Sequence, residues 1–83
     1  MRVVVALEAT DQYVALPGSI RARVHALLRR LEYWPRVSGV KALRGPLAGQ
    51  YRMRTGDYRV QFQLEPDQIV VVKIGHRDGF YDD

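Results

Sequence analysis

The feature that most constrains the fold is a strict alternation of apolar and polar side chains in the second half of the chain. In residues 51–54 Tyr and Met alternate with Arg, and in residues 58–64 apolar side chains alternate with Arg and Gln. Side chains two apart in a strand share a face, so each segment predicts a half-buried β-strand. Gly56 and Asp57 between them form the Gly-X pair of a two-residue turn. The sequence therefore predicts an antiparallel hairpin.

A third strand is predicted after the turn Glu65-Pro66-Asp67, in which proline stands at a favourable position. Ile69 to Ile74 is a near-continuous apolar run, which is typical of a strand buried on both faces or nearly so. Three consecutive strands joined by short turns predict an antiparallel meander.

The first half of the chain predicts a short strand followed by two helices. Arg2 to Leu7 is an apolar run suited to a buried strand, and Glu8 to Leu16 is a weaker helical segment with Thr10 as its candidate N-cap. The second helix opens at residues 17–19 and presents one apolar face, formed by Ile20, Val24, Leu27, Leu28 and Leu31.

A proline sets the end of this second helix. Pro35 restricts the residue before it, so Trp34 is expected to be the last helical residue. Arg36 to Leu47 contains two glycines and Pro46 and predicts a loop.

Eighty-three residues are enough for one domain, which we expect to span residues 1–83. The predicted fold class is α+β: an N-terminal strand, a two-helix hairpin, and a three-stranded antiparallel meander forming one small twisted sheet packed on the helices. The chain contains no cysteine, and we find no signal peptide or membrane-spanning segment. We therefore expect a cytoplasmic protein.

Positive charge is concentrated in the middle of the chain. Residues 36–77 hold eight basic and three acidic residues, a balance of +5, whereas the whole chain carries +4. Eleven of the thirteen cations are arginine, which favours bidentate contacts with phosphate. Nucleic acid is the first partner that this composition suggests, and a solvated charged surface is the alternative.

Three arginines are predicted to converge on one surface. Arg52 and Arg54 project from the face opposite Tyr51 and Met53, and Arg59 projects from the same open face of the neighbouring strand. Like charges at this spacing repel one another, and an anionic ligand would relieve the repulsion. An arginine-rich solvent face without a ligand is the alternative.

The residues after the third strand carry further chemical groups. His76, Arg77 and Tyr81 supply an imidazole, a guanidinium and a phenol within six positions. RNA cleavage requires a base for the 2′-hydroxyl, stabilisation of the phosphorane and an acid for the leaving 5′-oxygen. His76 is the candidate base and Tyr81 the candidate acid, with Arg54, Arg59 and Arg77 on the phosphate. No metal or other cofactor is required. A hydrogen-bonded surface histidine and a packing tyrosine are the alternatives.

These residues occur in an order that resembles the RelE/ParE superfamily of bacterial toxin-antitoxin toxins. The resemblance is strong from Val40 to Tyr81, whereas the N-terminal strand and first helix match only in length and position. The matching motifs are Leu43-Arg44-Gly45, Tyr51-Arg52-Met53-Arg54, Gly56-Asp57-Tyr58-Arg59-Val60 and Gly75-His76-Arg77 followed by Tyr81.

The resemblance implies an α+β toxin that cuts messenger RNA in the ribosomal A site without a metal. It implies the ribosome, messenger RNA and a cognate antitoxin as partners, no membrane, and a chain that is a monomer or dimer when free and a hetero-oligomer with its antitoxin. Catalytic or phosphate-binding positions of RelE-type nucleases match Arg52, Arg54, Arg59, Arg77 and Tyr81. His76 belongs to the Gly-His-Arg form of the motif, and Lys41 and Arg44 are further candidates for RNA binding.

The sequence departs from this family in its candidate bases. RelE has lysines at the positions of Arg52 and Arg54, and because Arg stays protonated, Arg54 is a phosphate clamp and not a base. Another branch has a Glu near the position of Lys41, which this chain lacks. We favour His76, since imidazole exchanges protons near neutral pH; water or the ribosome are the alternatives. The alternative functions are inhibition of DNA gyrase, as in ParE, and a degenerate toxin that only binds RNA or its antitoxin.

Overall fold

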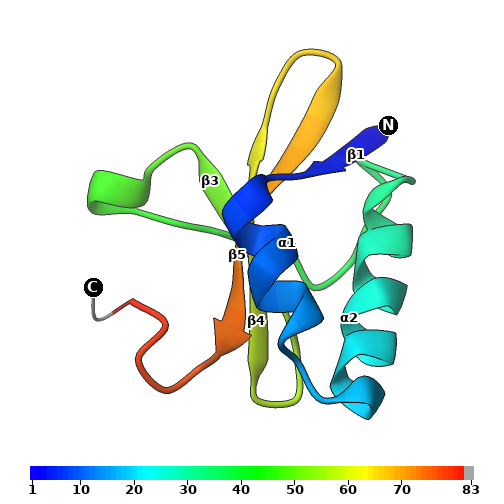
Figure 1. Ribbon diagram of the computed structural model, residues 1–83. Helices are drawn as coiled ribbons and strands as arrows, with labels where there is room; N and C mark the ends of the chain where they lie inside the picture. Colours follow the sequence, from blue (N-terminus) through cyan, green and yellow to red (C-terminus); the bar gives the residue numbers. More distant parts are fainter. Residues whose placement is uncertain (82–83) are drawn as a thin grey trace.

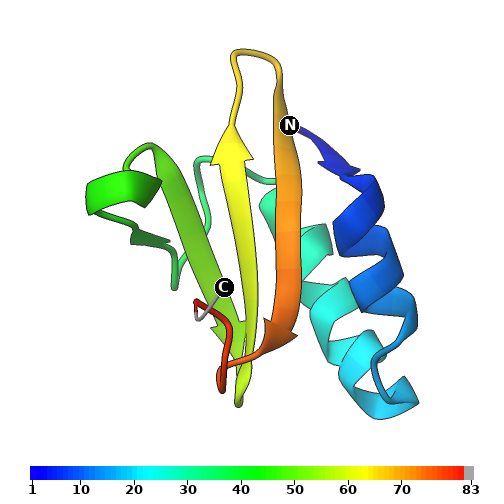
Figure 2. The same cartoon turned by 60° about the vertical axis from the view of Figure 1, so that its left-hand side comes forward.

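The computed structural model describes residues 1–81. It contains a five-stranded sheet with both α-helices on one face (Figures 1 and 2). No helix within this part of the chain has the length and hydrophobicity needed to cross a membrane. In chain order the elements are β1 (Arg2–Val5), α1 (Leu7–Val14), α2 (Gly18–Leu31), β2 (Lys41–Ala42), the 3₁₀ helix η1 (Gly45–Leu47), β3 (Gln50–Thr55), β4 (Tyr58–Leu64) and β5 (Gln68–His76).

The predicted hairpin is confirmed by the pairing of β3 with β4. Met53 lies opposite Val60 and Thr55 lies opposite Tyr58, so residues 56–57 form the two-residue turn. Gly56 has a φ of 58°, a conformation that glycine adopts at no steric cost. The α+β fold class and the antiparallel order of β3, β4 and β5 are likewise as expected.

The sheet is wider than the predicted meander because both of its outer strands come from the part of the chain that precedes the meander. The strand order is β1-β5-β4-β3-β2, with β1 parallel to β5 and β2 antiparallel to β3. The sequence predicted a loop from Arg36 to Leu47, which is wrong at Lys41–Ala42, a strand, and at Gly45–Leu47, a 3₁₀ helix. Two residues are too few for an alternating pattern, so only the pairing with β3 reveals this strand.

The helices are confirmed, but their ends differ from the prediction. Helix α2 ends at Leu31, and the Trp34 N–H donates to the Leu31 carbonyl at 3.1 Å within the turns that follow. Helix α1 begins after Ala6, which has no side-chain cap. Thr10 is therefore not an N-cap. Its hydroxyl donates to the Ala6 carbonyl at 3.1 Å from inside the helix, which a threonine in a first turn can do without ending the helix.

The core lies between the helices and one face of the sheet. Phe62 at its centre is fully buried, and its ring centroid lies 5.8 Å from that of Trp34 and 5.6 Å from that of Tyr51. The other buried apolar residues around it are Ala9, Leu16, Val24, Leu27, Leu31, Met53, Val60, Ile69, Val71 and Ile74. The opposite face of the sheet carries no helix, and we call it the open face (Figure 2).

A register shift in β5 decides which residues reach the open face. Phe62 lies opposite Val71 and Gln61 lies opposite Lys73, so Val72 is an extra residue in β5, a β-bulge. Beyond it the alternation is inverted. Ile74 is buried in the core three residues after Val71, which is also buried.

The inversion determines on which face of the sheet each residue at the end of β5 lies. Gly75 lies opposite Arg59, on the open face, whereas His76 lies opposite Tyr58, on the same side as Ile74 and the helices. The expectation that Ile69 to Ile74 is buried on nearly both faces is therefore only partly met, since Val70, Val72 and Lys73 are half-buried.

Candidate functional site

Four cations from three neighbouring strands share the open face. Lys41 lies opposite Arg52 in the pairing of β2 with β3, and Arg54 lies opposite Arg59 in the pairing of β3 with β4. Directly paired residues of an antiparallel ladder project to the same side, and residues two apart in one strand do so too. The convergence predicted for the three arginines is therefore present, with Lys41 added. We call Lys41, Arg52, Arg54 and Arg59 the basic face.

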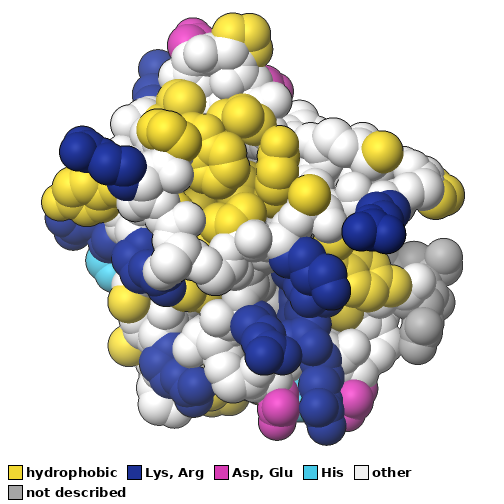
Figure 3. All heavy atoms as spheres, turned by 180° about the vertical axis from the view of Figure 1, so that it is seen from behind, with side chains coloured by type: hydrophobic (Ala, Val, Ile, Leu, Met, Phe, Trp, Pro, Cys, Tyr) yellow, Lys and Arg dark blue, Asp and Glu magenta, His cyan; other side chains and the backbone are white. Residues whose placement is uncertain are grey.

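The basic face lacks compensating charge. Within residues 1–81, none of its four side chains forms an ion pair or hydrogen bond with another side chain. One nitrogen of Arg59, Nη1, is buried and has no hydrogen-bond partner among the described residues. A buried donor without an acceptor is unfavourable, and an anionic ligand would supply the missing acceptor. Figure 3 shows Lys and Arg side chains gathered in the lower half of the view from behind, below a hydrophobic area.

Hollows in the surface lie beside the basic face. One of about 350 Å³ is lined by Gly39, Lys41, Arg52 and Arg54. Another of about 740 Å³ is lined by residues 40–44 and Arg52, which brings Arg44 close to the same cations. These volumes are in the range of ligand sites, and their lining would favour phosphate groups.

The segment after β5, residues 77–81, turns back across the open face, and we call it the tail (Figures 1 and 2). The Arg77 N–H donates to the Asp57 carbonyl at 2.7 Å, which ties the start of the tail to the β3–β4 turn. The Phe80 side chain is buried. The Tyr81 ring stands edge-on to it with centroids 4.9 Å apart and is 45% exposed, so the phenol is open to solvent.

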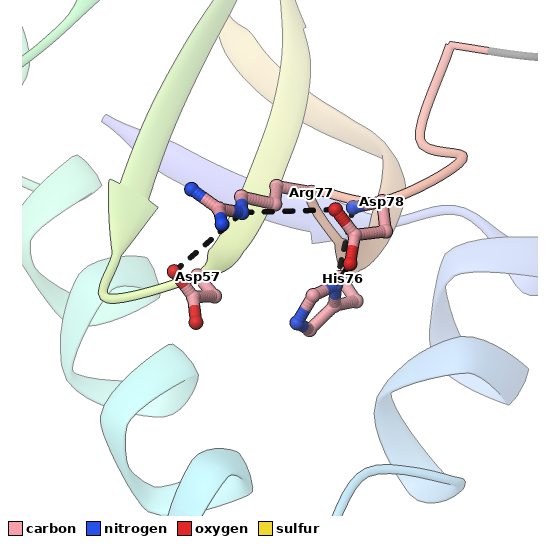
Figure 4. Close-up of polar contacts among 4 residues, drawn as sticks. All are labelled: Asp57, His76, Arg77 and Asp78. Carbon is pink, nitrogen blue, oxygen red and sulfur yellow. Dashed lines mark hydrogen bonds and ion pairs between the residues drawn. The ribbon is translucent and has the colours of Figure 1, made fainter.

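Arg77 differs from the basic face in having acidic neighbours. Its Nε lies 3.8 Å from Asp57 Oδ1 and 3.7 Å from Asp78 Oδ1, and the side chain is more than half exposed (Figure 4). Exposed ion pairs at these distances are weak, so they do not prevent Arg77 from binding another anion.

His76 points away from the basic face. Its ring stands edge-on to that of Tyr58, with centroids 5.2 Å apart, on the helix side of the sheet. Its Nδ1 accepts the Asp78 N–H at 3.1 Å and lies 3.5 Å from Asp78 Oδ2 (Figure 4). The structure therefore brings Arg52, Arg54 and Arg59 together on one face and does not bring His76 to them.

Sequence reasoning did not select two residues that shape this site, Lys73 and Phe80. The Lys73 ammonium lies 4.8 Å from the centroid of the Phe80 ring and donates to the Phe80 carbonyl. A signal was available in the sequence, since Lys73 is the one charged residue within the apolar run from Ile69 to Ile74. Its face was hidden because the bulge inverts the alternation just before it.

The arrangement is suited to holding and polarising phosphate. Several guanidinium groups can donate to one phosphodiester and stabilise added negative charge on it, and a phenol can donate a proton. Among residues 1–81, no three His, Asp or Glu side chains lie close enough together to hold a metal ion.

Known proteins match the chain over almost its full length. Residues 5–79 match the family described as the ParE toxin of the type II toxin-antitoxin system parDE. The chain is similar to the toxin RelE3 of Methanocaldococcus jannaschii, with 26% identity over 85 residues that cover 99% of this chain and 97% of the relative.

Solved structures agree with the sequence match. A chain of the RelBE2 toxin-antitoxin complex of Mycobacterium tuberculosis superposes with a TM-score of 0.80 and 28% identity, covering 92% of this chain and 96% of that chain. A chain of the archaeal RelE-RelB complex of Pyrococcus horikoshii gives a TM-score of 0.74 and 30% identity, covering 92% and 93%. The protein therefore belongs to the ParE toxin family of type II toxin-antitoxin systems, within the RelE/ParE superfamily that its motifs resemble.

Proposed function

We propose that this toxin is an endoribonuclease that cuts messenger RNA on the ribosome, in the bacterial cytoplasm, without a metal ion. The observation that carries the proposal is a basic face without acidic partners within residues 1–81, which includes the buried Nη1 of Arg59. The tail beside this face carries the exposed Tyr81. Such a face is costly to keep unless an anion occupies it, and the scissile phosphate of RNA is that anion.

Each step of the cleavage has a candidate group. The 2′-oxygen attacks phosphorus and forms the 2′,3′-cyclic phosphate, while the bond from phosphorus to the 5′-oxygen breaks. Arg54 and Arg59 stabilise the extra negative charge on the phosphorane, with Arg52, Arg77, Lys41 and Arg44 holding the neighbouring phosphates. Tyr81 donates its proton to the leaving 5′-oxygen, so that an alcohol and not an alkoxide is released.

The proton of the 2′-hydroxyl needs an acceptor other than the arginines, which stay protonated. His76 packs on Tyr58 on the far side of β5, so we assign it to holding the tail through Asp78 and not to the reacting atoms. Water or a ribosomal group accepts the proton. Alignment of the 2′-oxygen with the phosphate by the ribosome supplies much of the rate, which explains why a toxin without its own base depends on the ribosome.

The similar proteins support an antitoxin partner. The M. tuberculosis and P. horikoshii structures are both toxin-antitoxin complexes. We propose that a cognate antitoxin covers the basic face with an acidic segment that folds on binding, since charge complementarity and an open sheet surface favour such a partner. The same contact would exclude RNA.

Inhibition of DNA gyrase, the activity that the resemblance to ParE implies, is the second candidate. One observation favours it: His76, the imidazole that the sequence offered as the base, is turned to the other face. A toxin that acts only by binding a protein has no need of a base at its basic face. It also has no need of an aligned phenol, so Tyr81 distinguishes the two functions.

The test is induction of the toxin in a bacterium, followed by primer extension on a translated message and on a copy without its start codon. We expect cuts only in the translated message, and we expect them to disappear with Tyr81→Phe. Tyr33→Phe is the matched control, because Tyr33 is exposed in the turns that follow α2, outside the site. Growth arrest without cuts, together with loss of supercoiling by purified gyrase, would instead establish the second candidate.

A further inference from the structure

Phe80 is buried although it lies in the tail, outside every helix and strand. Its side chain is 3% exposed, while both of its neighbours, Gly79 and Tyr81, are exposed. A large aromatic side chain with this burial in a surface segment is an anchor for that segment. The residues that hold Phe80 are therefore the ones that fix the tail.

The Phe80 ring packs directly against Gly75. A methyl group placed on Gly75 would lie 3.4 Å from Phe80 Cδ1 and 3.7 Å from Cε1, so the ring occupies the space where a side chain of residue 75 would stand. Gly75 lies opposite Arg59 on the open face. The ring therefore packs on the open face at the residue that lies opposite Arg59 in the pairing of β4 with β5.

Lys73 holds Phe80 from a second side. Lys73 lies two residues before Gly75 on the open face of β5, its ammonium is 4.8 Å from the ring centroid, and it donates to the Phe80 carbonyl. A cation over an aromatic face and a charge-assisted hydrogen bond to the same residue restrict both its ring and its backbone. The bulge at Val72 places Lys73 and Gly75 together on this face.

We propose that Phe80, held by Gly75 and Lys73, is a positioning residue that fixes the Tyr81 phenol, whose ring it contacts. The proposal rests on the nuclease function proposed above and adds residues that touch neither RNA nor the reacting atoms. Its physical basis is preorganisation: a proton donor contributes to the rate only when it is held within a fraction of an ångström of its productive position.

The proposal is tested by single-turnover cleavage of a message on programmed ribosomes, using toxin purified from its antitoxin complex. Phe80→Ala should lower the rate at saturating toxin about 100-fold, the loss expected from a misplacement of about 1 Å, and leave the half-saturating concentration nearly unchanged. Phe80→Leu should restore most of the rate because a branched apolar side chain can still fill the space above Gly75. Tyr33→Ala, which removes an exposed aromatic ring elsewhere, should behave as the unmutated toxin.

Lys73 gives an independent variant in case Phe80→Ala does not fold. Lys73→Met should lower the saturating rate in the same way, and Lys73→Arg should retain more of it, since Arg keeps the cation and the donor. An unchanged saturating rate in the folded Phe80→Ala variant, or a loss that appears only in the half-saturating concentration, would overturn the proposal while leaving the nuclease function standing.

A second measurement separates the anchor from the nuclease function. The ¹H–¹⁵N heteronuclear NOE of residues 78–81 should fall in Phe80→Ala or Lys73→Met and stay high in Tyr33→Ala. If the unmutated toxin cuts no RNA, the nuclease function fails and the anchor is decided by this measurement alone. Tail NOE values that do not respond to either variant would show that Phe80 holds nothing in place.

Discussion

Arg54 on β3 and Arg59 on β4 lie directly opposite each other on the open face, and neither is paired with an acidic side chain within the described residues. Cross-strand neighbours of like charge destabilise a sheet. The hairpin would be more stable with a neutral residue at either position. We therefore interpret the two arginines as residues that serve binding and lower the stability of the fold.

Replacing Arg54 by Gln should therefore stabilise the protein and weaken its function. We expect the free energy of unfolding in urea to rise by about 0.2–1 kcal/mol, because the substitution removes the repulsion from Arg59. RNA cleavage should fall in the same variant. Arg29→Gln is the control, since Arg29 on α2 pairs at 3.4 Å with Glu32, the residue after the helix, and its loss should not stabilise the protein. Destabilisation by Arg54→Gln would contradict an unpaired basic face.

Inorganic tripolyphosphate should stabilise the unmutated toxin. A ligand that binds only the folded state adds about 2.7 kcal/mol at a concentration of about 100 times its Kd, which a thermal melt detects easily. The shift should be much smaller in Arg52→Gln, because Arg52 lines both hollows beside the basic face. Equal shifts in the two proteins would place the anion elsewhere.

Tyr81→Phe should remove cleavage and spare binding. The substitution deletes only the phenolic proton donor, and general acids contribute about 10²–10⁴-fold to rate. We expect a loss of this size in the saturating rate on programmed ribosomes, with unchanged sedimentation of the toxin with ribosomes. A fully toxic Tyr81→Phe variant would end the assignment of Tyr81 as the acid.

His76→Gln should be much less harmful than Tyr81→Phe. The His76 ring packs against Tyr58 on the helix side, so its loss should loosen the start of the tail without removing a group from the basic face. The saturating rate should fall well short of the roughly 100-fold loss that marks a proton-transfer residue. A larger loss would return His76 to the role of base that the sequence suggested.

Phe62→Ala should inactivate the toxin by unfolding it. Phe62 is fully buried between Trp34 and Tyr51, and removal of such a ring costs about 3–5 kcal/mol. We expect a large fall in the urea midpoint and loss of the circular dichroism signal near physiological temperature. A stable, inactive Phe62→Ala variant would mean that the core contributes to the site more directly than its position suggests.

Sequence periodicity predicted the elements whose structure depends on residues close together in the sequence. The β3–β4 hairpin and helix α2 follow from alternation and from one apolar helical face, and both are present. Strand β2 and the placement of β1 beside β5 were not predictable in this way. They depend on pairings between distant segments. A strand of two or four residues is too short for its sequence pattern to identify the strand with which it pairs.

The basic face was predictable and the position of His76 was not, for one physical reason. Uninterrupted alternation from Ile69 and Val71 would put His76 on the open face with the arginines. The extra residue Val72 inverts the alternation, so that Ile74 enters the core and His76 follows it. A bulge of this kind leaves no clear mark in the sequence, since Val suits a regular strand equally well.

The parallel pairing of β1 with β5 has a consequence for how the toxin folds. Arg2 pairs with Gln68, which is 68 − 2 = 66 positions away, whereas the β3–β4 hairpin closes through a turn of two residues. Local pairs form early and distant pairs form late, because the entropy of closing the long loop must be lost first. Most of the basic face therefore forms in a fast local step. Strand β5 also pairs locally with β4 through the short turn at residues 65–67, so only the pairing of β1 along the outer edge of β5 is left for a slower step.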